Sequence, residues 1–327
     1  MRKHWKLKGV IQGLLSRLPY GVVINSALQK SSGDLADFED HLGRKVQDFR
    51  FYSERCREAL GRLEGIEIVE IGTGWFPLLP ILFSLCGAKR IWTFDRTRHL
   101  NAALTFRGLR ALGPHLPLVS EWSGVPVPEL ERRLTQLLQT APHLHALLAQ
   151  ARIRYQAPGD AADTKLPNAS VDLVFSNSVL EHVPKPAVKQ LFAESARILR
   201  PDGVAVHGVN CGDHYAYFDR QITQINFLQY SERDWALWNN DLLYQNRLRP
   251  PDFKSILEDE SLDLIFERRS ARPGCAEAFE HLRVAPEFAH YDKRDLVCTS
   301  FDFVARPKPA TQAMPSPAPR QRVNAAL

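Results

Sequence analysis

The chain has 327 residues, of which 44% are hydrophobic and 24% are charged, and its formal net charge is +5. This composition is that of an ordinary globular protein, and it excludes a fibrous or wholly disordered chain. The charge is mild and spread along the sequence, so it permits an anionic partner without indicating one. Five widely spaced cysteines form no CxxC pair, which disfavours a disulfide framework or a cysteine zinc site and favours a cytoplasmic location.

The N-terminal segment, residues 1–39, is basic and contains a short apolar stretch. Arg17 and Pro19 interrupt that stretch, and no run of about 18 apolar residues occurs in the chain. We therefore predict neither a signal peptide nor a transmembrane segment. Two alternatives remain open for residues 1–23: a helix that packs on the folded domain, and a basic amphipathic helix in peripheral contact with a membrane.

Strands and helices alternate from residue 40 onward. Apolar residues recur three, four or seven positions apart over 40–63, which predicts a helix, and a second helix over 187–200 is ended by Pro201 and Gly203. The predicted strands lie at 66–72, 89–95, 151–157, 171–177, 203–210, 262–269 and 295–306. This alternation predicts an α/β fold with a doubly wound, Rossmann-like, mostly parallel seven-stranded sheet. Because no convincing helix separates the last two strands, we expect them to pair antiparallel, with one reversed strand at the edge.

Two segments exceed what such a sheet requires. Residues 114–150 form a predicted helical insertion, and residues 211–255 form an aromatic-rich insertion after the fifth strand. Insertions at the carboxyl ends of strands commonly cover the ligand crevice of an α/β sheet. The folded domain is thus expected to span 40–306, and the proline- and alanine-rich tail at 307–327 is expected to be disordered.

The sequence EIGTGW at 70–75 joins the first predicted strand to the next helix. Gly72 and Gly74 allow the backbone to bend and a ligand to approach it closely. A dinucleotide fingerprint requires a third glycine at the position of Pro77, so pyrophosphate binding is disfavoured. Glu70 would repel a pyrophosphate but suits a positively charged ligand, such as S-adenosylmethionine with its sulfonium and ammonium groups.

Asp95 ends the second predicted strand, where a carboxylate can accept hydrogen bonds from two ribose hydroxyls. At these residues the chain resembles the class I S-adenosylmethionine-dependent methyltransferases, in the type 11-like group with small-molecule acceptors. The resemblance covers roughly residues 60–210 and includes LPNASVDLVFSNSVLEHVP at 166–184; the family's ExGxGxG pattern has a glycine where this chain has Phe76.

The resemblance implies a set of residues that bind S-adenosylmethionine. These are Glu70, Gly72, Thr73, Gly74, Asp95, Arg96, Asp160, Ala161 and Asn177. Asp160 is expected beside the adenine amino group, with Asp163 as its competitor. A structural role as a turn acid is the alternative for Asp160.

Two histidines are candidates for catalysis. His214 follows the fifth strand beside Asp213, and His182 follows Glu181 after the fourth strand. Methyl transfer from a sulfonium needs a general base mainly when the acceptor is a hydroxyl, and either imidazole can take that proton. A structural role remains the alternative for each. No metal site is predicted, because the histidines of the helical insertion, His143 and His145, lack a ligand pattern.

We therefore predict an S-adenosylmethionine-dependent methyltransferase that acts on a small-molecule acceptor, with oxygen favoured as the methylated atom. Cell-envelope polysaccharide or secondary-metabolite biosynthesis is the expected setting. The alternative is an S-adenosylmethionine-binding accessory or assembly protein without catalysis. Nucleic acid is not an expected partner, since the loop after the fourth strand reads SNSVLEHV rather than [DN]PP[YF] and no basic stripe with interleaved aromatics is present.

Overall fold

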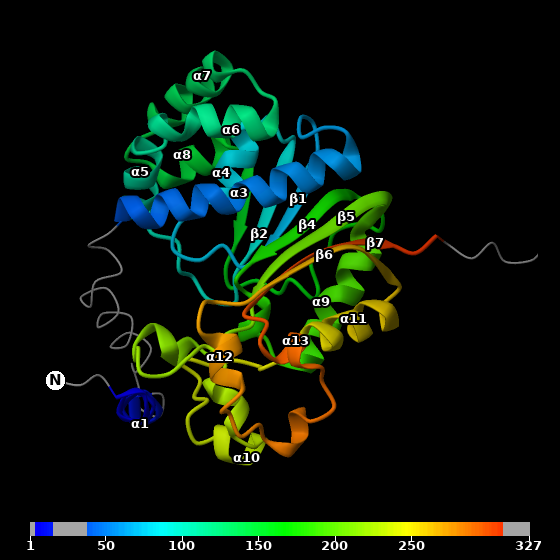
Figure 1. The fold of residues 1–327 in the computed structure, drawn as a ribbon. Helices are drawn as coiled ribbons and strands as arrows, with labels where there is room; N and C mark the ends of the chain where they lie inside the picture. Colours follow the sequence, from blue (N-terminus) through cyan, green and yellow to red (C-terminus); the bar gives the residue numbers. More distant parts are fainter. Residues whose placement is uncertain (1–3, 16–37, 310–327) are drawn as a thin grey trace, which may run out of the picture.

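The protein, described by a computed structural model over residues 4–15 and 38–309, is built on a seven-stranded sheet (Figure 1). The strand order is β3-β2-β1-β4-β5-β7-β6. The strands are β1 (Glu67–Ile71), β2 (Arg90–Phe94), β3 (Ile153–Gln156), β4 (Val171–Asn177), β5 (Leu199–Asn210), β6 (Leu262–Ser270) and β7 (Ser300–Pro307). The pairs among β1 to β5 are parallel, and β7 is antiparallel to β5 and β6. The predicted mostly parallel, doubly wound sheet of seven strands is confirmed.

The reversed strand lies one position inside the edge rather than at the edge. β7 pairs with β5 on one side and with β6 on the other, so the edge strand β6 runs parallel to β1 to β5. The connection between β6 and β7 holds α12 (Cys275–Phe279), η5 (Pro286–Phe288) and α13 (Lys293–Leu296). Because β7 pairs directly with β6, a short hairpin would also connect them, so these short helices are an addition between two adjacent strands.

Helices cover both faces of the sheet. One face carries α3 (Phe38–Leu60), α4 (Leu78–Leu85) and α5 (Ala102–Arg110), and the other carries α9 (Lys185–Ile198) and α11 (Pro250–Asp259). Adjacent residues of β1 feed opposite cores: Ile68 belongs to the first apolar cluster and Val69 to the second. Strands buried on both faces are rich in apolar residues, and this enrichment allowed their positions to be predicted from the sequence.

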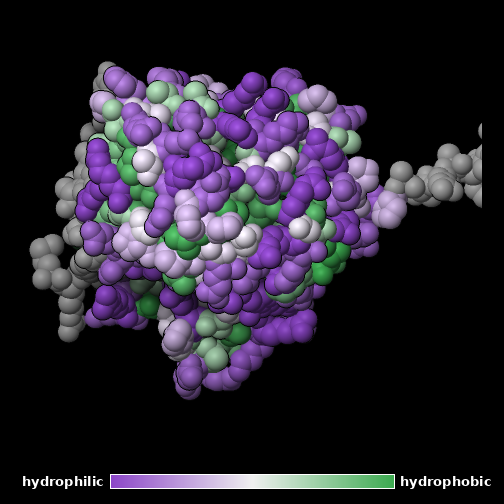
Figure 2. All heavy atoms as spheres, turned by 90° about the horizontal axis from the view of Figure 1, so that it is seen from above, coloured by the Kyte–Doolittle hydropathy of each residue, from purple (hydrophilic) through white to green (hydrophobic). Residues whose placement is uncertain are grey.

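The predicted insertion at 114–150 widens the first helical layer. It forms α6 (Leu116–Ser123), α7 (Val127–Leu138) and α8 (Leu144–Gln150), after the short η1 (Gly113–His115). Leu130, Leu134 and Leu137 of α7 are buried in the same apolar cluster as α3 and α4. The insertion therefore packs over a face of the sheet rather than over the carboxyl ends of its strands. Seen from above, the outer surface of the molecule is mainly hydrophilic (Figure 2).

A third apolar cluster joins α1 (Trp5–Leu15) to the segments that follow β5 and β6. The Trp5 ring lies 5.3 Å from that of Tyr215 and 5.4 Å from that of Trp238, between ring centroids. Short helices η3 (His214–Tyr217), η4 (Asn226–Gln229) and α10 (Glu232–Trp235) carry much of this cluster, in which Phe227 and Trp235 are buried. Most of the aromatic stretch is thus core.

Helix α1 packs on the domain through one face only. Its opposite face exposes Leu7, Val10, Ile11 and Leu14, so the peripheral membrane contact expected for residues 1–23 stays a prediction. Residues 1–3 and 16–37, with the tail from 310 to 327, lie outside the described residues. In the part of the chain that the structure describes, no helix is both long enough and apolar enough to cross a membrane.

Candidate active site

The glycine turn after β1 brings two loops of the sheet together. Gly72 and Gly74 have φ angles of +77° and +74°, in the region that favours glycine. A Cβ atom on Gly72 would lie 2.5 Å from Cγ2 of Val179, in the loop after β4, whereas one on Gly74 would meet no atom within 4 Å. Gly72 therefore allows close packing of the two loops, and Gly74 faces open space from which a ligand can approach the backbone.

Alanine at these two glycines should have unequal effects on stability. Both substitutions force an L-residue into the left-handed region, at about 1–2 kcal/mol each. Gly72→Ala should lower the free energy of unfolding by about 1–3 kcal/mol more than Gly74→Ala, because the stiff Val179 side chain must also move. Urea unfolding of the two variants measures the difference, and equal losses would show that the Val179 contact is unimportant.

Phe76 replaces a glycine of the usual family pattern without disturbing the turn. Its ring lies 5.9 Å from that of Phe38, between centroids, and beside Gly108 of α5. The side chain thus packs into the helical layer. Pro77 immediately precedes α4.

Glu70 lies at the carboxyl half of β1 and is almost fully buried. Its Oε2 atom has no hydrogen-bond partner. Burial raises the pKa of Glu70 to about 8, an effect that the nearby Thr73 hydroxyl and Lys45 partly oppose. A buried carboxyl without a partner is unfavourable in isolation, and a cationic ligand would satisfy it.

Asp95 closes the glycine turn from the end of β2. Its Oδ1 accepts a hydrogen bond from the backbone N–H of Thr73 at 3.1 Å, and its Oδ2 accepts one from Gly74 at 3.2 Å. Burial raises the pKa of Asp95, while Tyr155 acts in the opposite direction. The same two N–H groups fix the Asp95 carboxylate, so the glycine turn itself positions the residue that is predicted to bind the ribose. Arg96, the next residue, is exposed.

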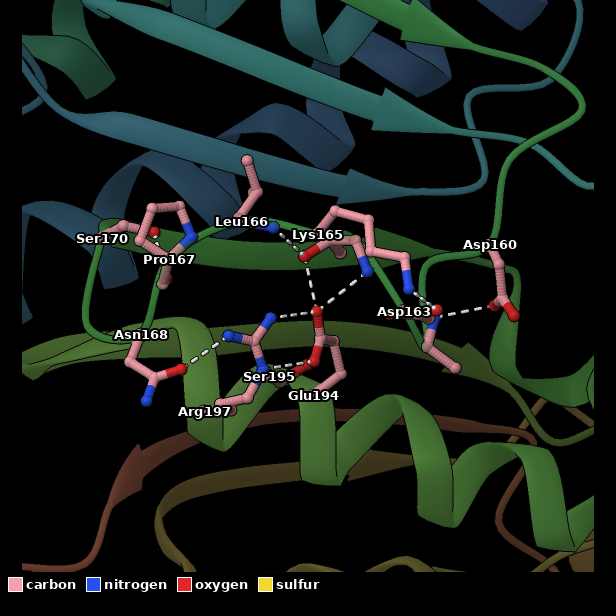
Figure 3. A network of polar contacts seen from close by, with 12 residues as sticks. Asp160, Asp163, Lys165, Leu166, Pro167, Asn168, Ser170, Glu194, Ser195 and Arg197 are labelled. Carbon is pink, nitrogen blue, oxygen red and sulfur yellow. Dashed lines mark hydrogen bonds and ion pairs between the residues drawn. The ribbon is translucent and has the colours of Figure 1, made fainter.

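The loop after β3 lies beside Asp95, because Gly159 donates its backbone N–H to the Asp95 carbonyl at 2.9 Å. Asp160 is exposed, and its Oδ1 accepts a hydrogen bond from the backbone of Ala162 at 2.8 Å. Asp163 instead forms an ion pair with Lys165 at 2.5 Å (Figure 3). Since Asp163 already has a cationic partner, Asp160 is the better candidate of the two.

A polar network holds this loop on α9 (Figure 3). Glu194 accepts hydrogen bonds from the Thr164 backbone at 2.9 Å and from Arg197 at 2.7 Å, and Arg197 also donates to Asn168. Ala161, another predicted cofactor residue, packs at the rim of the second apolar cluster. The network therefore holds the loop against α9, while Asp160 remains exposed to solvent.

Asn177 ends β4 and faces a different space from Glu70 and Asp95. It lines a cleft of about 870 Å³ between α3 and the ends of β5, β6 and β7. Its Nδ2 donates to Asp48 Oδ2 at 3.0 Å. The cleft is lined largely by polar side chains, among them Asn210, Tyr217 and Gln224.

His182 and His214 are brought together although they are far apart in sequence. Their ring centroids lie 4.9 Å apart in an edge-to-face arrangement. Burial lowers the pKa of both and brings that of His214 to about 3, so both imidazoles are uncharged at neutral pH. Tyr217, whose hydroxyl accepts a hydrogen bond from Asn210 at 2.8 Å, lies 5.6 Å from His214 between ring centroids and connects the pair to the cleft.

Asp213 does not orient the His214 imidazole, which corrects the pairing considered from the sequence. Its Oδ1 accepts the backbone N–H of Tyr215 at 2.8 Å, and its Oδ2 accepts Asn226 Nδ2 at 2.9 Å. Asp213 therefore caps η3 and ties it to Asn226 at the start of η4. The neighbours of the imidazole are His182 and Tyr217 instead.

Several polar residues at the crevice were missing from the sequence prediction. Lys45 of α3 lowers the pKa of both Glu70 and Glu181, which places the two carboxyls in one electrostatic environment. Asp48 and Gln224 line the cleft. Lys45 and Asp48 lie on the polar side of the helix predicted over 40–63, and periodicity alone assigns that side to solvent.

Comparisons with known proteins agree with this geometry. Residues 123–207, which include β3, β4, α9 and most of β5, match the family model described as "Methyltransferase domain". The matched range does not include the turn at 70–74. No curated protein matches the chain.

Similar solved structures include two enzymes with bound cofactor product. The 1,6-didemethyltoxoflavin-N1-methyltransferase of Burkholderia thailandensis is 16% identical, with a TM-score of 0.45 and 89% of each chain covered. The geranyl diphosphate C-methyltransferase of Streptomyces coelicolor A3(2) is 14% identical, with a TM-score of 0.44, over 78% of this chain and 76% of that one. Similarity at this level indicates nothing about the acceptor.

The family match and the site agree on the cofactor. The matched region supplies the fourth-strand block, and the ExGxG turn supplies an unsatisfied buried carboxyl and an open approach at Gly74. The chain thus carries a methyltransferase domain on a Rossmann-like sheet, with a site whose geometry suits S-adenosylmethionine.

Proposed function

We propose that this enzyme transfers a methyl group to an oxygen of a small, hydroxyl-rich acceptor. The observation that carries the proposal is the polar cleft of about 870 Å³ that Asn177 borders at the end of β4 and that Tyr217 connects to His214. Amide, hydroxyl and carboxylate side chains suit an acceptor that offers many hydroxyl groups. Such chemistry fits a sugar, as in cell-envelope polysaccharide biosynthesis, better than an apolar metabolite.

The cofactor-binding residues follow from the turn. Glu70 faces the cationic part of S-adenosylmethionine, the backbone of Thr73 and Gly74 lies along it, and Asp95 accepts the ribose hydroxyls. Both Asp95 oxygens already accept backbone N–H groups, and each retains a lone pair for a hydroxyl. Asp160 and Ala161 would flank the adenine, Arg96 would lie at the outer end of the site, and Asn177, which lines the cleft, would meet the cofactor from the acceptor side.

The chain's part in catalysis is alignment, exclusion of water and removal of one proton. When bound, S-adenosylmethionine supplies a methyl group that is already activated by the sulfonium. A new bond forms from the acceptor oxygen to the methyl carbon, the carbon–sulfur bond breaks, and its electron pair stays on sulfur as S-adenosylhomocysteine leaves. The hydroxyl proton must go elsewhere, and His182 and His214 are the groups that serve its removal.

Binding of S-adenosylmethionine at pH 7 should release close to one proton from the protein. With its pKa raised to about 8, Glu70 is mostly protonated in the free protein at pH 7. A cation beside it favours the carboxylate and lowers this pKa in the complex, so the proton leaves and affinity rises as the pH approaches 8 from below. Titration calorimetry in two buffers with different ionisation enthalpies measures the release.

Glu70→Gln is the matched control for this measurement. The amide keeps the shape of the side chain but cannot ionise, so the variant should bind more weakly and without proton release. An unchanged proton release in Glu70→Gln would assign the proton to another group.

The acceptor class can be tested with a panel of sugars, phenols and amines. Release of S-adenosylhomocysteine should occur with hydroxyl-bearing acceptors and be absent with amines alone. Turnover on amines but not on hydroxyls would overturn the proposal of oxygen as the methylated atom.

We propose a reducing cytoplasm as the location of the protein. Its five cysteines support this, because all are buried and none forms a disulfide.

A further inference from the structure

Three ligand-type side chains meet after the ends of β4 and β5. Glu181 and His182 lie on η2 (Leu180–His182), and His214 lies at the start of η3. One side-chain ligand atom from each lies within 4.8 Å of the others. Within residues 4–15 and 38–309, no other group of three such side chains meets this criterion.

Three polar atoms of this cluster lack a hydrogen-bond partner. Glu181 is only 1% exposed, and neither of its carboxylate oxygens has a partner, although the backbone N–H groups of Glu181 itself and of Asn210 lie near enough to stabilise its charge. The Nε2 atom of His214 is also buried without a partner. Because buried polar atoms are normally satisfied, an unpartnered carboxylate beside an unpartnered imidazole nitrogen indicates a missing ligand.

The second ring nitrogen of His182 is already committed. Its Nδ1 atom lies 2.8 Å from the carbonyl oxygen of Tyr244, an acceptor that requires the proton on Nδ1. The Nε2 lone pair is therefore available. Metal-bound histidines characteristically donate their other ring N–H to a carbonyl or carboxylate in this way.

The same segment, 244–246, holds all three ligand-bearing residues in place. Besides the Tyr244 contact, Gln245 Oε1 accepts the backbone N–H of His214 at 3.2 Å. Asn246 donates its backbone N–H to the Glu181 carbonyl at 2.9 Å. The cluster thus sits on a supporting layer of its own, which a chance meeting of three side chains would not require.

We propose that Glu181, His182 and His214 bind one divalent first-row transition metal ion, with zinc as the best fit. Two imidazoles and one carboxylate form the ligand set of many catalytic zinc sites, whereas Mg²⁺ and Ca²⁺ prefer oxygen ligands alone. Two ligands at about 2.0–2.2 Å from one ion are at most about 4.4 Å apart. The observed limit of 4.8 Å requires only a small side-chain adjustment on binding.

The electrostatics of the cluster allow such an ion. Lys45 and Lys8 are positive charges that act on Glu181 and His214, respectively, and they oppose a cation there. Against them stand the Glu181 carboxylate and the lone pairs that the two imidazoles can offer to an ion.

The catalytic role of the ion rests on the proposed function, whereas the existence of the metal site does not depend on it. His182 is partly open to solvent, so the three protein ligands leave a coordination position for an outside oxygen. An ion there would lower the pKa of an acceptor hydroxyl, and the histidines would then act through the metal instead of taking the proton themselves. This proposal departs from the sequence-based expectation of no metal site.

Metal binding can be measured without knowing the acceptor. The full chain is treated with a chelator, dialysed and titrated with Zn²⁺ by calorimetry, and with Co²⁺ by visible absorption. We expect one equivalent of Zn²⁺ per chain, and a Co²⁺ spectrum with the intensity of a four- or five-coordinate site. His214→Ala and Glu181→Gln should each bind Zn²⁺ about 100-fold more weakly or worse.

His145→Ala is the control, because His145 is exposed on α8 and belongs to no such cluster. It should bind zinc as the unmodified chain does. Retained S-adenosylmethionine binding shows that each variant is folded. No stoichiometric Zn²⁺ in the unmodified chain, or equal affinity in His214→Ala and Glu181→Gln, overturns the proposal. Metal binding without S-adenosylhomocysteine release on any acceptor would leave the site intact and count against the proposed function alone.

Discussion

An Asp95→Ala chain should bind S-adenosylmethionine about 30- to 1000-fold more weakly than the unmodified chain, a loss of about 2–4 kcal/mol. The variant would lose the two charge-assisted hydrogen bonds that we propose between Asp95 and the ribose. The turn also loses its internal support, because Asp95 accepts the backbone N–H groups of Thr73 and Gly74. Calorimetric titration with the cofactor measures the affinity.

Two further variants separate these causes. Asp95→Asn keeps an oxygen acceptor for the turn but loses the charge, so its affinity should fall between the other two. Asp163→Ala removes a nearby carboxylate that pairs with Lys165, and its affinity should be unchanged. Unchanged affinity in Asp95→Ala would show that Asp95 does not bind the ribose.

His214→Ala should lower kcat by about 10²- to 10⁴-fold on the acceptor that the panel identifies. The side chain lies next to His182 and Tyr217, and it contacts none of the predicted cofactor residues that the structure describes. Affinity for S-adenosylmethionine should therefore stay within about twofold of the unmodified chain. Steady-state release of S-adenosylhomocysteine gives kcat, and calorimetry gives the affinity.

A His214→Ala chain that keeps most of its kcat would make His214 structural. The same measurement on His182→Ala then decides whether the other histidine carries the role. Since burial lowers the pKa of both histidines, a loss of activity cannot be traced to a charge that either would carry at neutral pH. The loss would reflect a missing lone pair.

The parallel part of the sheet could be predicted because its strands are buried on both faces. In β1, every residue is buried, and Ile68, Val69 and Ile71 mark the strand before the glycine turn that follows. The position of β7 could not be predicted in the same way. Its antiparallel pairing with β6 was predicted, but the local sequence does not say on which side of β6 the returning strand lies.

The cofactor-binding residues could be predicted because they lie close together in the sequence. The spacing of Glu70, Gly72, Gly74 and Asp95 reflects one strand, one turn and the next strand, and the structure brings these residues together. The two histidines were predicted as candidates, but their contact with each other was not. His182 and His214 were each noticed beside an acid, but adjacency in sequence suggested Asp213 as a partner, and the fold supplied Glu181 and the other histidine instead.

The central claim is methyl transfer to a small molecule, and the most direct measurement follows the label from [methyl-¹⁴C]S-adenosylmethionine. The full chain is incubated with the labelled cofactor and a bacterial extract, which is then separated into low-mass, protein and nucleic acid fractions. The account predicts label in the low-mass fraction with the unmodified chain and about background label with Asp95→Ala. Label in protein or nucleic acid, or no label in any fraction despite cofactor binding, would contradict it.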